Sequence, residues 1–519
     1  MTQPIKIIDL FAGPGGLGEG FSSLIDSDGN PRFKISLSIE KEESAHRTLT
    51  LRAFFRQFPR NKVPDEYYEF LTGRLGKNPS EQLYKTNSLK KQVQSAHDES
   101  RCLTLGKDNK EIHAAIDEAL GRNIEPWVLI GGPPCQAYSL VGRARNKGNT
   151  AYSAENDHRN FLYLEYLKVI AKFQPAVFVM ENVKGMLSAK INGKKIIDDI
   201  LSDLKRPNDS LKLNVHDVEY EIFSLSKELL INPLPTDFLI RSEEYGIPQA
   251  RHRVILLGVR KDIANKITPG VLTSNKGSSV TVKDVISDLP KLRSGLSKFP
   301  DTKQKWATSI INGNKELFSE LEKMQLKPTA ELMQESIKHI SDSKLSRGQN
   351  WSQPSLSKGP KKLADWYQDP SGRNLVCNHE TRGHIKEDLK RYLFCSCYSA
   401  SSGLSTQQTP KAKDFPKILA PHHGSWSSGK FSDRFKVQLA NKVASTITSH
   451  ISKDGHYYIH YDPQQCRSLT VREAARIQTF PDNYFFVGTR TQQYVQVGNA
   501  VPPYLAKQIS SIVFDILAN

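Results

Sequence analysis

The N-terminal segment constrains the fold of this chain more than any other part of its sequence. Ile5–Leu10 is a short apolar run, Gly13–Gly18 fits the pattern G-x-G-x-x-G, and Leu17–Ile25 is amphipathic. This order predicts a strand, a tight turn and a helix. Glycines in such a turn allow a ligand to approach the backbone and the helix N-terminus. The segment therefore predicts an α/β fold with a ligand site at its first turn.

The same alternation recurs along the chain. A helical pattern covers Phe161–Phe173, and helical patterning returns near the end at Thr470–Thr479 and Pro503–Leu517. Further strands are predicted at Phe33–Ile39, Trp127–Ile130, Ala176–Met180 and Arg253–Val259. Strands that alternate with helices predict a doubly wound, mostly parallel sheet, which the C-terminal tail rejoins.

Two stretches break this alternation. Residues 63–122 are polar and lose strand periodicity apart from a helical stretch at Glu111–Leu120, which predicts a peripheral insertion on the edge of the sheet. Residues 262–466 contain Gly/Ser-rich breaks and no βα alternation, which predicts irregular structure. We therefore expect two domains: 1–261 with 467–519, and a second, irregular domain at 262–466.

Composition limits the class of protein. Of 519 residues 38% are hydrophobic, which is typical of a globular protein, and no apolar run approaches the length of about 18 residues that a membrane span needs. The N-terminus lacks the features of a signal peptide, and six cysteines without a C-x-x-C pair suit a reducing compartment. These features predict a cytoplasmic protein that does not contact membranes.

The net charge is strongly positive. Lys and Arg number 72 against 55 Asp and Glu, a difference of +17. Such an excess favours a polyanionic partner, because phosphate contacts release counterions. Nucleic acid is the first hypothesis, although many basic proteins use their charge only for solubility.

An acidic residue follows the predicted glycine turn at a spacing that is typical of nucleoside-binding sites. Glu40 ends the second strand, 22 residues after Gly18, where a carboxylate can hold the two ribose hydroxyls of a nucleoside. The pattern predicts a nucleoside-containing cofactor. At this point a nicotinamide cofactor remains an alternative.

Reactive residue types follow the other predicted strands. Cys135 comes after Gly131–Pro134, where two prolines restrict the backbone and direct the thiol, so we interpret it as a nucleophile. The alternative for a single cysteine is a small buried apolar residue. Glu181 ends another strand, and Arg251 and Arg253 can point to the same face of the sheet. For these three residues a structural ion pair is the alternative.

The motifs in their order resemble the DNA cytosine-5 methyltransferase family. The resemblance covers residues 1–60, 125–260 and 440–519. The segments that carry it are Asp9–Gly16, Pro133–Gln136, Glu181–Val183, Gln249–Arg253, Arg467–Pro481 and Gln496–Pro503. In this family the sequence-recognition domain lies between the last arginine motif and Arg467–Thr470, which coincides with the irregular domain.

The resemblance implies S-adenosyl-L-methionine as cofactor and a covalent mechanism. Catalytic roles are implied for Cys135, Glu181, Arg251 and Arg253: the thiolate adds to cytosine C6, Glu181 serves N3 and the amine, and Arg251 steadies O2. The implied cofactor-binding residues are Phe11, Gly13, Pro14, Gly16, Glu40, Lys41, Pro134, Leu162, Asn499 and Val501. The family's acidic adenine contact has only a loose match, Gly106-Lys107-Asp108.

The resemblance also implies double-stranded DNA as the partner, with the target cytosine flipped out of the helix. The basic segment Ser139–Asn156 resembles a mobile catalytic loop that closes over phosphates. The implied DNA contacts are Gln136, Ser139, Arg143, Arg145, Lys147, Thr446 and Thr448. We expect a monomer whose cognate restriction endonuclease acts on the same DNA site and need not bind the enzyme.

Three other functions are alternatives to this one. An RNA cytosine methyltransferase shares the motifs but does not explain the large 262–466 domain. A nicotinamide-dependent dehydrogenase fits only the glycine turn and Glu40, and a non-catalytic DNA-binding protein does not require Cys135. The spacing of Cys377, His379, His384, Cys395 and Cys397 is unlike that of a structural zinc site, so no metal is predicted.

Overall fold

The computed structural model contains two compact units. The structure describes residues 3–121, 125–134, 160–191, 193–213, 218–228, 233–275, 277–298, 300–354, 359–402, 407–421, 426 and 433–518. Unit 1 consists of Met1–Val63, Ser80–Ser278 and Asn499–Asn519. Unit 2 consists of Pro64–Pro79 and Ser279–Gly498.

Unit 1 is built on one eight-stranded sheet with the order β3-β2-β1-β4-β5-β11-β8, in which β9 also pairs with β11. Strands β1 to β5 run parallel, and β11 is antiparallel to its neighbours. Their bounds are β1 Ile5–Leu10, β2 Phe33–Glu40, β3 Ser100–Cys102, β4 Val128–Gly131, β5 Val177–Val183, β8 Tyr220–Phe223, β9 Leu239–Arg241 and β11 His252–Arg260. The predicted doubly wound, mostly parallel sheet is confirmed.

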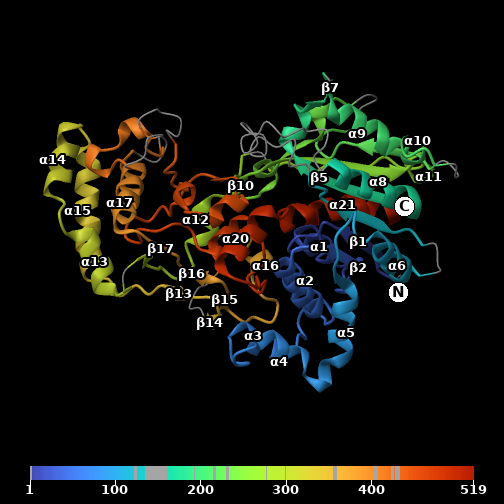
Figure 1. Cartoon of the computed structure of the whole chain (residues 1–519), viewed down its shortest axis with the longest axis horizontal. Helices are drawn as coiled ribbons and strands as arrows, with labels where there is room; N and C mark the ends of the chain where they lie inside the picture. The colour runs from blue at the N-terminus through green and yellow to red at the C-terminus, as the bar shows by residue number, and fades with distance from the viewer. Residues whose placement is uncertain are drawn as a thin grey trace. The chain divides into compact units, whose positions relative to one another are not determined.

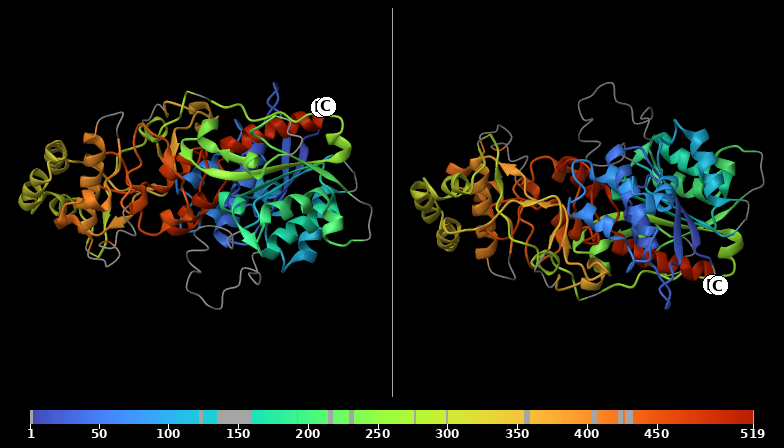
Figure 2. Two further views of the ribbon diagram at one scale, coloured as in Figure 1. Left: turned by 90° about the horizontal axis from the view of Figure 1, so that it is seen from above. Right: turned by 90° about the horizontal axis from the view of Figure 1, so that it is seen from below.

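Helices cover both faces of this sheet (Figure 1). The helices of unit 1 are α1 Gly16–Ser22, α2 Glu43–Arg56, α4 Pro79–Tyr84, α5 Lys90–Glu99, α6 Asn109–Leu120, α8 Asn160–Phe173, α9 Ile196–Lys205, α10 Pro207–Ser210, α11 Lys261–Ala264 and α21 Pro503–Ala518. Helix α1 packs against α21, which is drawn in red along the sheet in both views of Figure 2. Residues 499–519 therefore belong to unit 1.

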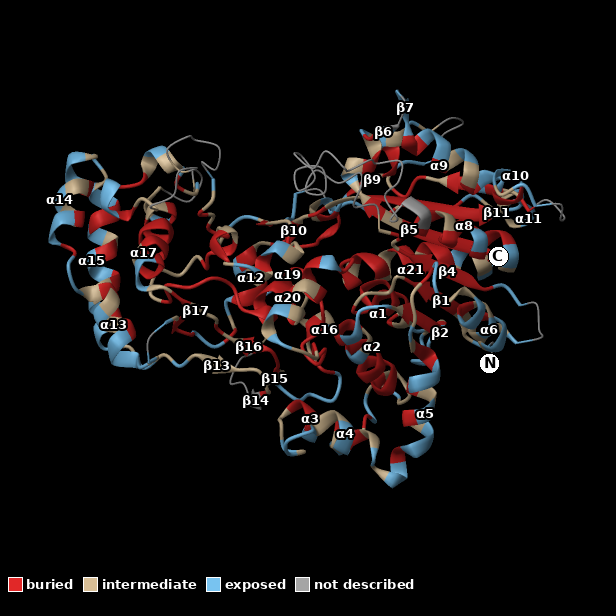
Figure 3. Cartoon of the chain, viewed as in Figure 1, coloured by how far each residue is buried: buried red, intermediate tan, exposed pale blue. Residues whose placement is uncertain are grey.

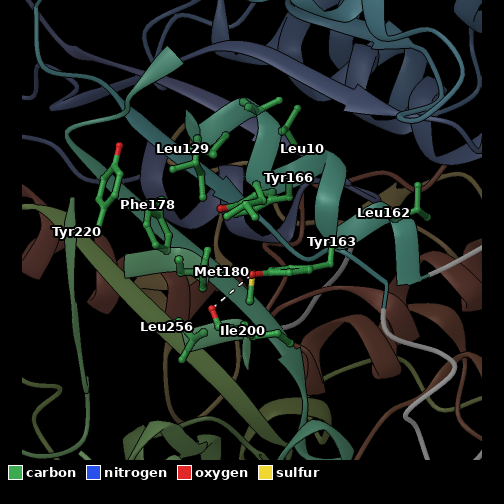
Figure 4. Close-up of a cluster of buried hydrophobic side chains, with 14 of the residues drawn as sticks. Leu10, Leu129, Leu162, Tyr163, Tyr166, Phe178, Met180, Ile200, Tyr220 and Leu256 are labelled. Carbon is green, nitrogen blue, oxygen red and sulfur yellow. Dashed lines mark hydrogen bonds between the residues drawn. The ribbon is translucent and has the colours of Figure 1, made fainter. Parts of the chain in front are cut away.

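Two apolar layers enclose the strands. On one face Leu129 of β4 and Met180 of β5 pack with Tyr163 and Tyr166 of α8, and Tyr163 donates a 3.4 Å hydrogen bond to the carbonyl of Ile200 (Figure 4). The other face packs against α1 and α21. Because both faces are covered, the central strands β4, β5 and β11 are almost continuously buried (Figure 3).

The insertion contributes an edge strand to the sheet. Helix α6 confirms the predicted helical stretch, but β3 was not predicted, since three residues are too short to show periodicity. The strand is fastened to α2 by Ser100: its Oγ lies 2.7 Å from Thr50 Oγ1, and its carbonyl lies 3.2 Å from His46 Nε2. Strand β3 thus lies at the edge of the sheet, while residues 64–79 of the insertion belong to unit 2.

Unit 2 contains more helix than the irregular structure that the sequence predicted. Its helices are α3 Asp65–Leu71, α12 Val282–Ile286, α13 Lys303–Ile311, α14 Lys315–Lys323, α15 Lys327–Ser341, α16 Ala364–Tyr367, α17 Lys386–Ser401, α19 Val471–Ile477 and α20 Arg490–Asn499. Its paired strands are the two-residue elements β12 Gly295–Leu296, β13 Gly348–Gln349, β14 Gln353–Pro354, β15 Leu375–Val376, β16 His379–Glu380 and β17 Gly383–His384. Helices α13, α14, α15 and α17 share an apolar core that includes Trp306 and Leu389.

The compact units divide the chain at other positions than the predicted domains, because residues 467–498 pack in unit 2. Thr470 and Glu473 form a capping box at the start of α19, as the predicted helix start requires. The buried guanidinium of Arg467 pairs with Glu473, and the buried guanidinium of Arg476 pairs with Asp482. Arg467 also donates to the carbonyl of Leu292 at 3.2 Å and Arg476 to that of Val285 at 2.9 Å, and these bonds tie α19 to the rest of unit 2.

No helix in the described ranges is both long enough and apolar enough to cross a membrane.

The buried histidines of unit 2 predict a loss of stability in mild acid. Burial lowers the pKa of His379 and of His460 to about 4, against an ordinary value of 6.5. Between these values the unfolded chain binds protons that the folded protein does not, so stability falls as the pH drops. Each histidine contributes a loss of about 2 kcal/mol between pH 7 and pH 5. Thermal unfolding of His460→Gln should show a weaker acid dependence than the wild type, whereas His450→Gln, at an exposed position, should not.

Candidate functional site

The carboxyl ends of the parallel strands bring most of the predicted site residues to one edge of the unit 1 sheet. Phe11 and Gly13 follow β1, Glu40 ends β2, Pro134 follows β4, and Glu181 lies near the end of β5. Parallel α/β sheets bind their ligands at this edge. The fold thus places residues from distant parts of the sequence in one row.

The glycine turn is fixed to the end of β2. Gly13 and Gly15 have φ angles of 57° and 91°, in the left-handed region that favours glycine, and Phe11 shares it at 57°. The backbone N–H of Gly13 donates a 2.8 Å hydrogen bond to Glu40 Oε2, and the N–H of Glu42 donates one of 2.8 Å to Glu40 Oε1. Each oxygen of Glu40 therefore has one fixed donor and can accept a second.

Space around the turn differs from one glycine to the next. A Cβ on Gly13 would meet no atom within 4 Å, so this side of the turn is open. A Cβ on Gly16 would overlap with the backbone carbonyl of Val501, so the segment after α20 lies directly against the turn. The structure thereby brings Val501 to the predicted site, and it places Asn499 as an exposed residue two positions earlier.

The outer part of the row involves β3. Cys102 is the register partner of Glu40, and its exposed thiol lies 3.8 Å from the carbonyl of Lys41. No sequence pattern marked Cys102 as a site residue, because the strand β3 that carries it was not predicted. The loosely matched Asp108 accepts a 2.8 Å hydrogen bond from the N–H of Thr104, so its carboxylate holds the loop before α6.

Lys41 and Leu162 are the two other residues predicted to contact the adenine. Lys41 is exposed, directly after Glu40. Leu162 is 8% exposed and belongs to the apolar layer of α8. The adenine contact predicted for these residues stays a prediction.

Asn182 holds the turn that leads toward Cys135. Its amide Nδ2 donates a 3.2 Å hydrogen bond to the carbonyl of Pro133, and its Oδ1 accepts one of 2.8 Å from the N–H of Val183. A Cβ on Gly132 would lie only 3.1 Å from Glu181 Oε2. The side chain of Asn182 therefore fixes the turn after β4. Because Gly132 has no side chain, the carboxylate of Glu181 can lie close to this turn.

Glu181 is paired with Arg253. Arg253 Nε lies 2.8 Å from Glu181 Oε1, and both side chains remain partly exposed, at 16% and 14%. The ion pair that sequence analysis left open as an alternative is present in the structure. Since both groups are accessible, the pair is compatible with a chemical role as well as a structural one.

Arg251 has a different environment from Arg253. It is 1% exposed, and its carbonyl accepts hydrogen bonds from the N–H of Ser242 at 3.1 Å and from the Ser242 hydroxyl at 2.7 Å. The segment Ser242–Tyr245 thus holds the strand β11 at its start. Burial favours Arg253 over Arg251 as the arginine that can reach a ligand.

The remaining predicted contacts lie outside the described residues or in the other unit. Cys135, Gln136, Ser139, Arg143, Arg145 and Lys147 lie outside the described residues. Thr446 and Thr448 belong to unit 2, where the Tyr458 hydroxyl donates to the Thr446 carbonyl at 3.0 Å and lies 3.0 Å from Thr448 Oγ1. Their predicted contact with DNA stays a prediction.

The histidines considered as metal ligands have protein partners. His379 Nδ1 lies 2.9 Å from Thr470 Oγ1 and its Nε2 2.8 Å from the carbonyl of Pro290, while His384 contacts Tyr392 and Ser468. Among the residues that the structure describes, no group of three or more His, Cys, Asp and Glu side chains could hold a metal ion.

Comparison with known proteins identifies the family. The family model of the C-5 cytosine-specific DNA methylase matches residues 83–514. The chain is 32% identical to the type II methyltransferase M.Bpa9945I of Bacillus paralicheniformis, over 98% of this chain and 99% of the relative. It is 24% identical to the type II methyltransferase M.AgeI of Thalassovita gelatinovora, over 98% and 99%.

A solved structure shares the fold. It is a DNA modification methyltransferase encoded within a prophage of E. coli, which superimposes with a TM-score of 0.51 at 18% identity and covers 99% of this chain and 100% of its own. The family match decides against the nicotinamide-dependent dehydrogenase, which the glycine turn alone had left open. With a family model that covers most of its length and a full-length relative above 30% identity, this chain belongs to the C-5 cytosine-specific DNA methylases.

Proposed function

We propose that this DNA cytosine-5 methyltransferase uses S-adenosyl-L-methionine and acts through covalent addition of Cys135 to a flipped-out cytosine. The observation that carries the proposal is the row of groups at one sheet edge, from Glu40 through the glycine turn to Glu181. A row of this order has a nucleoside-binding end and a reactive end.

The residues present fit the cofactor. The open side of Gly13 leaves room for a ligand, and Glu40 has acceptor capacity for two ribose hydroxyls. Phe11, Pro14 and Gly16 surround the turn, and Val501 closes it from the C-terminal segment. When bound, S-adenosylmethionine supplies an electrophilic methyl group, and the residues named here determine where it is presented.

The reactive end activates the pyrimidine. Cytosine C5 is too weak a nucleophile to accept a methyl group unaided, so the thiolate of Cys135 adds to C6 and raises the electron density at C5. Glu181 hydrogen-bonds N3 and the exocyclic amine and supplies a proton at N3, which neutralises the charge of the adduct as it forms. After methylation, loss of the C5 proton expels the thiol.

Arg253 is the proposed partner of the pyrimidine O2. Sequence analysis implied Arg251 for this role, but the burial of Arg251 and the Glu181–Arg253 pair favour Arg253. In this proposal Arg251 maintains the start of β11, and Arg253 contacts O2 beside the carboxylate of Glu181. The guanidinium then stabilises negative charge on the ring.

Unit 2 is the proposed recognition domain. Residues 279–498 hold 32 Lys and Arg against 20 Asp and Glu, so this segment carries most of the positive charge. We infer that it binds duplex DNA mainly through phosphates and reads one site through base edges. The type II relatives favour a role in protecting host DNA from a restriction endonuclease.

The direct test of the proposed function is methyl transfer. Purified enzyme with S-adenosylmethionine labelled in the methyl group should label duplex DNA, and bisulfite sequencing should place the label at C5 of cytosine in one sequence context. Incorporation into tRNA but not into duplex DNA would show that the substrate is RNA.

Replacement of Cys135 by serine should abolish turnover, because a hydroxyl adds to C6 far more slowly than a thiolate. The wild type should form a denaturation-resistant adduct with DNA that contains 5-fluorocytosine, since fluorine cannot leave as a proton does. Cofactor binding, measured by calorimetry, should stay near that of the wild type. An adduct that persists in Cys135→Ser would assign the nucleophile to another residue.

Replacement of Glu181 by glutamine should slow the chemical step by at least about a hundredfold while DNA affinity changes little, because an amide can hydrogen-bond but cannot supply the proton. Single-turnover methylation separates this step from binding. A wild-type single-turnover rate in Glu181→Gln would leave the ion pair with Arg253 as a structural contact only.

Exchange of unit 2 should change the site that is methylated. A chimera with residues 64–79 and 279–498 from a relative of different specificity should methylate the relative's sequence, because base-edge contacts belong to that unit. Bisulfite sequencing of DNA from cells that express the chimera gives the answer. Methylation of the original sequence would place the specificity in unit 1.

A further inference from the structure

Four charged side chains form a buried cluster around helix α1, which directly follows the glycine turn. We call it the α1 charge cluster; it consists of Glu19 on α1, Arg52 and Arg56 on α2, and Glu99 on α5. Arg52 Nε donates a 2.8 Å hydrogen bond to Glu19 Oε2. Arg56 lies 3.8 Å from Glu19 and pairs directly with Glu99. Each of these side chains is at most 14% exposed.

Arg56 is the cation that these acids share. Burial alone would raise the pKa of Glu19, but Arg52 and Arg56 outweigh it and hold that pKa below its ordinary value. Burial raises the pKa of Glu99, and Arg56 opposes the increase. The same guanidinium acts on Asp9 of β1, whose pKa burial raises to about 8 and Arg56 keeps from rising further.

The cluster connects the insertion to the elements that carry the proposed cofactor site. Asp9 lies on β1 two residues before Phe11, and a Cβ on Gly18 of α1 would lie 3.2 Å from its Oδ2. Helix α1 has no side-chain cap at Gly15, and the backbone N–H of Gly18 in its first turn faces the Asp9 carboxyl. The ion pairs of Glu19 therefore contribute to the position of this helix, together with its packing on α21.

Loss of Arg56 would leave the buried Glu99 without its paired guanidinium and would leave Glu19 with Arg52. Asp9 would lose the charge that keeps its pKa from rising further. Removing one partner of a buried ion pair costs far more than a surface pair contributes, so neighbouring groups shift to reduce the cost. The groups that can shift here are β1, α1 and α5. The first two are the strand and helix that flank the glycine turn.

We propose that Arg56 and Glu99 are positioning residues for the cofactor site: they hold α1 and β1 so that the turn at Gly13 and the carboxylate of Glu40 keep their binding geometry. The insertion then supports cofactor binding through α5, a role that its sequence did not indicate. This inference rests on the proposed function, which supplies the cofactor.

The experiment measures affinity for S-adenosylhomocysteine by calorimetry in the full-length protein. Arg56→Gln should raise Kd by about tenfold, which corresponds to about 1.4 kcal/mol, and Glu99→Gln should raise it a few-fold. Arg56→Lys keeps the charge and should recover most of the affinity. KM for S-adenosylmethionine should rise in parallel, whereas kcat at saturating cofactor and affinity for DNA should stay within about twofold of the wild type.

A buried ion pair in unit 2 provides the matched control. Arg293 Nη1 lies 2.7 Å from Asp301 Oδ1, and its side chain is 9% exposed. Arg293→Gln should lower the melting temperature as Arg56→Gln does, yet leave Kd for S-adenosylhomocysteine unchanged. This comparison separates positioning of the cofactor site from general loss of stability.

An unchanged Kd in folded Arg56→Gln would overturn the inference, as would an equal rise of Kd in Arg293→Gln. If Arg56→Gln does not fold, Glu99→Gln decides, because it leaves Arg56 paired with Glu19; an unchanged Kd there also overturns the inference. Failure of the wild type to bind S-adenosylhomocysteine would instead refute the proposed cofactor.

Discussion

The structure of unit 1 depends on the parallel pairing of β1 with both β2 and β4. This register brings Asp9 opposite Ser38 and Ile130, so the turns that follow the three strands emerge at one edge. Parallel strands allow this because each chain reversal passes through a helix on a face of the sheet. The glycine turn, Glu40 and the turn that leads toward Cys135 are neighbours for that reason, although up to about 120 residues separate them in sequence.

The polar groups at this edge are fixed by other polar groups rather than by the apolar core. Backbone N–H groups hold Glu40, an amide from Asn182 holds the Pro133 carbonyl, and Arg253 holds Glu181. Such contacts restrict side chains that would otherwise lose little by rotating into solvent. Pre-positioned donors and acceptors suit the proposed mechanism, since groups that stabilise charge in a transition state act best when they need not reorganise.

Unit 2 obtains its order from a different source. Its paired strands are two residues long, and buried arginines bridge the segments between them: Arg472 donates to the carbonyls of Cys377, Pro481 and Tyr484. Guanidinium groups have five donors in a rigid plane, so one side chain can satisfy several backbone carbonyls that no sheet would pair. A lobe held in this way can vary its loops, which suits the recognition role proposed for it.

The sequence by itself determined the strands β1, β2, β4, β5 and β11, the glycine turn, the helices α6, α8 and α21 and the family, because these features depend on periodicity and on short motifs. Glu40 and Glu181 could be placed at strand ends for the same reason. Only the tertiary structure decided which arginine is accessible, since Arg251 and Arg253 have the same spacing and differ only in burial. It also decided the place of the insertion and of residues 467–498: β3 has three residues, too few for a pattern, and the partners of Arg56 and Arg467 come from segments that the linear order does not bring together.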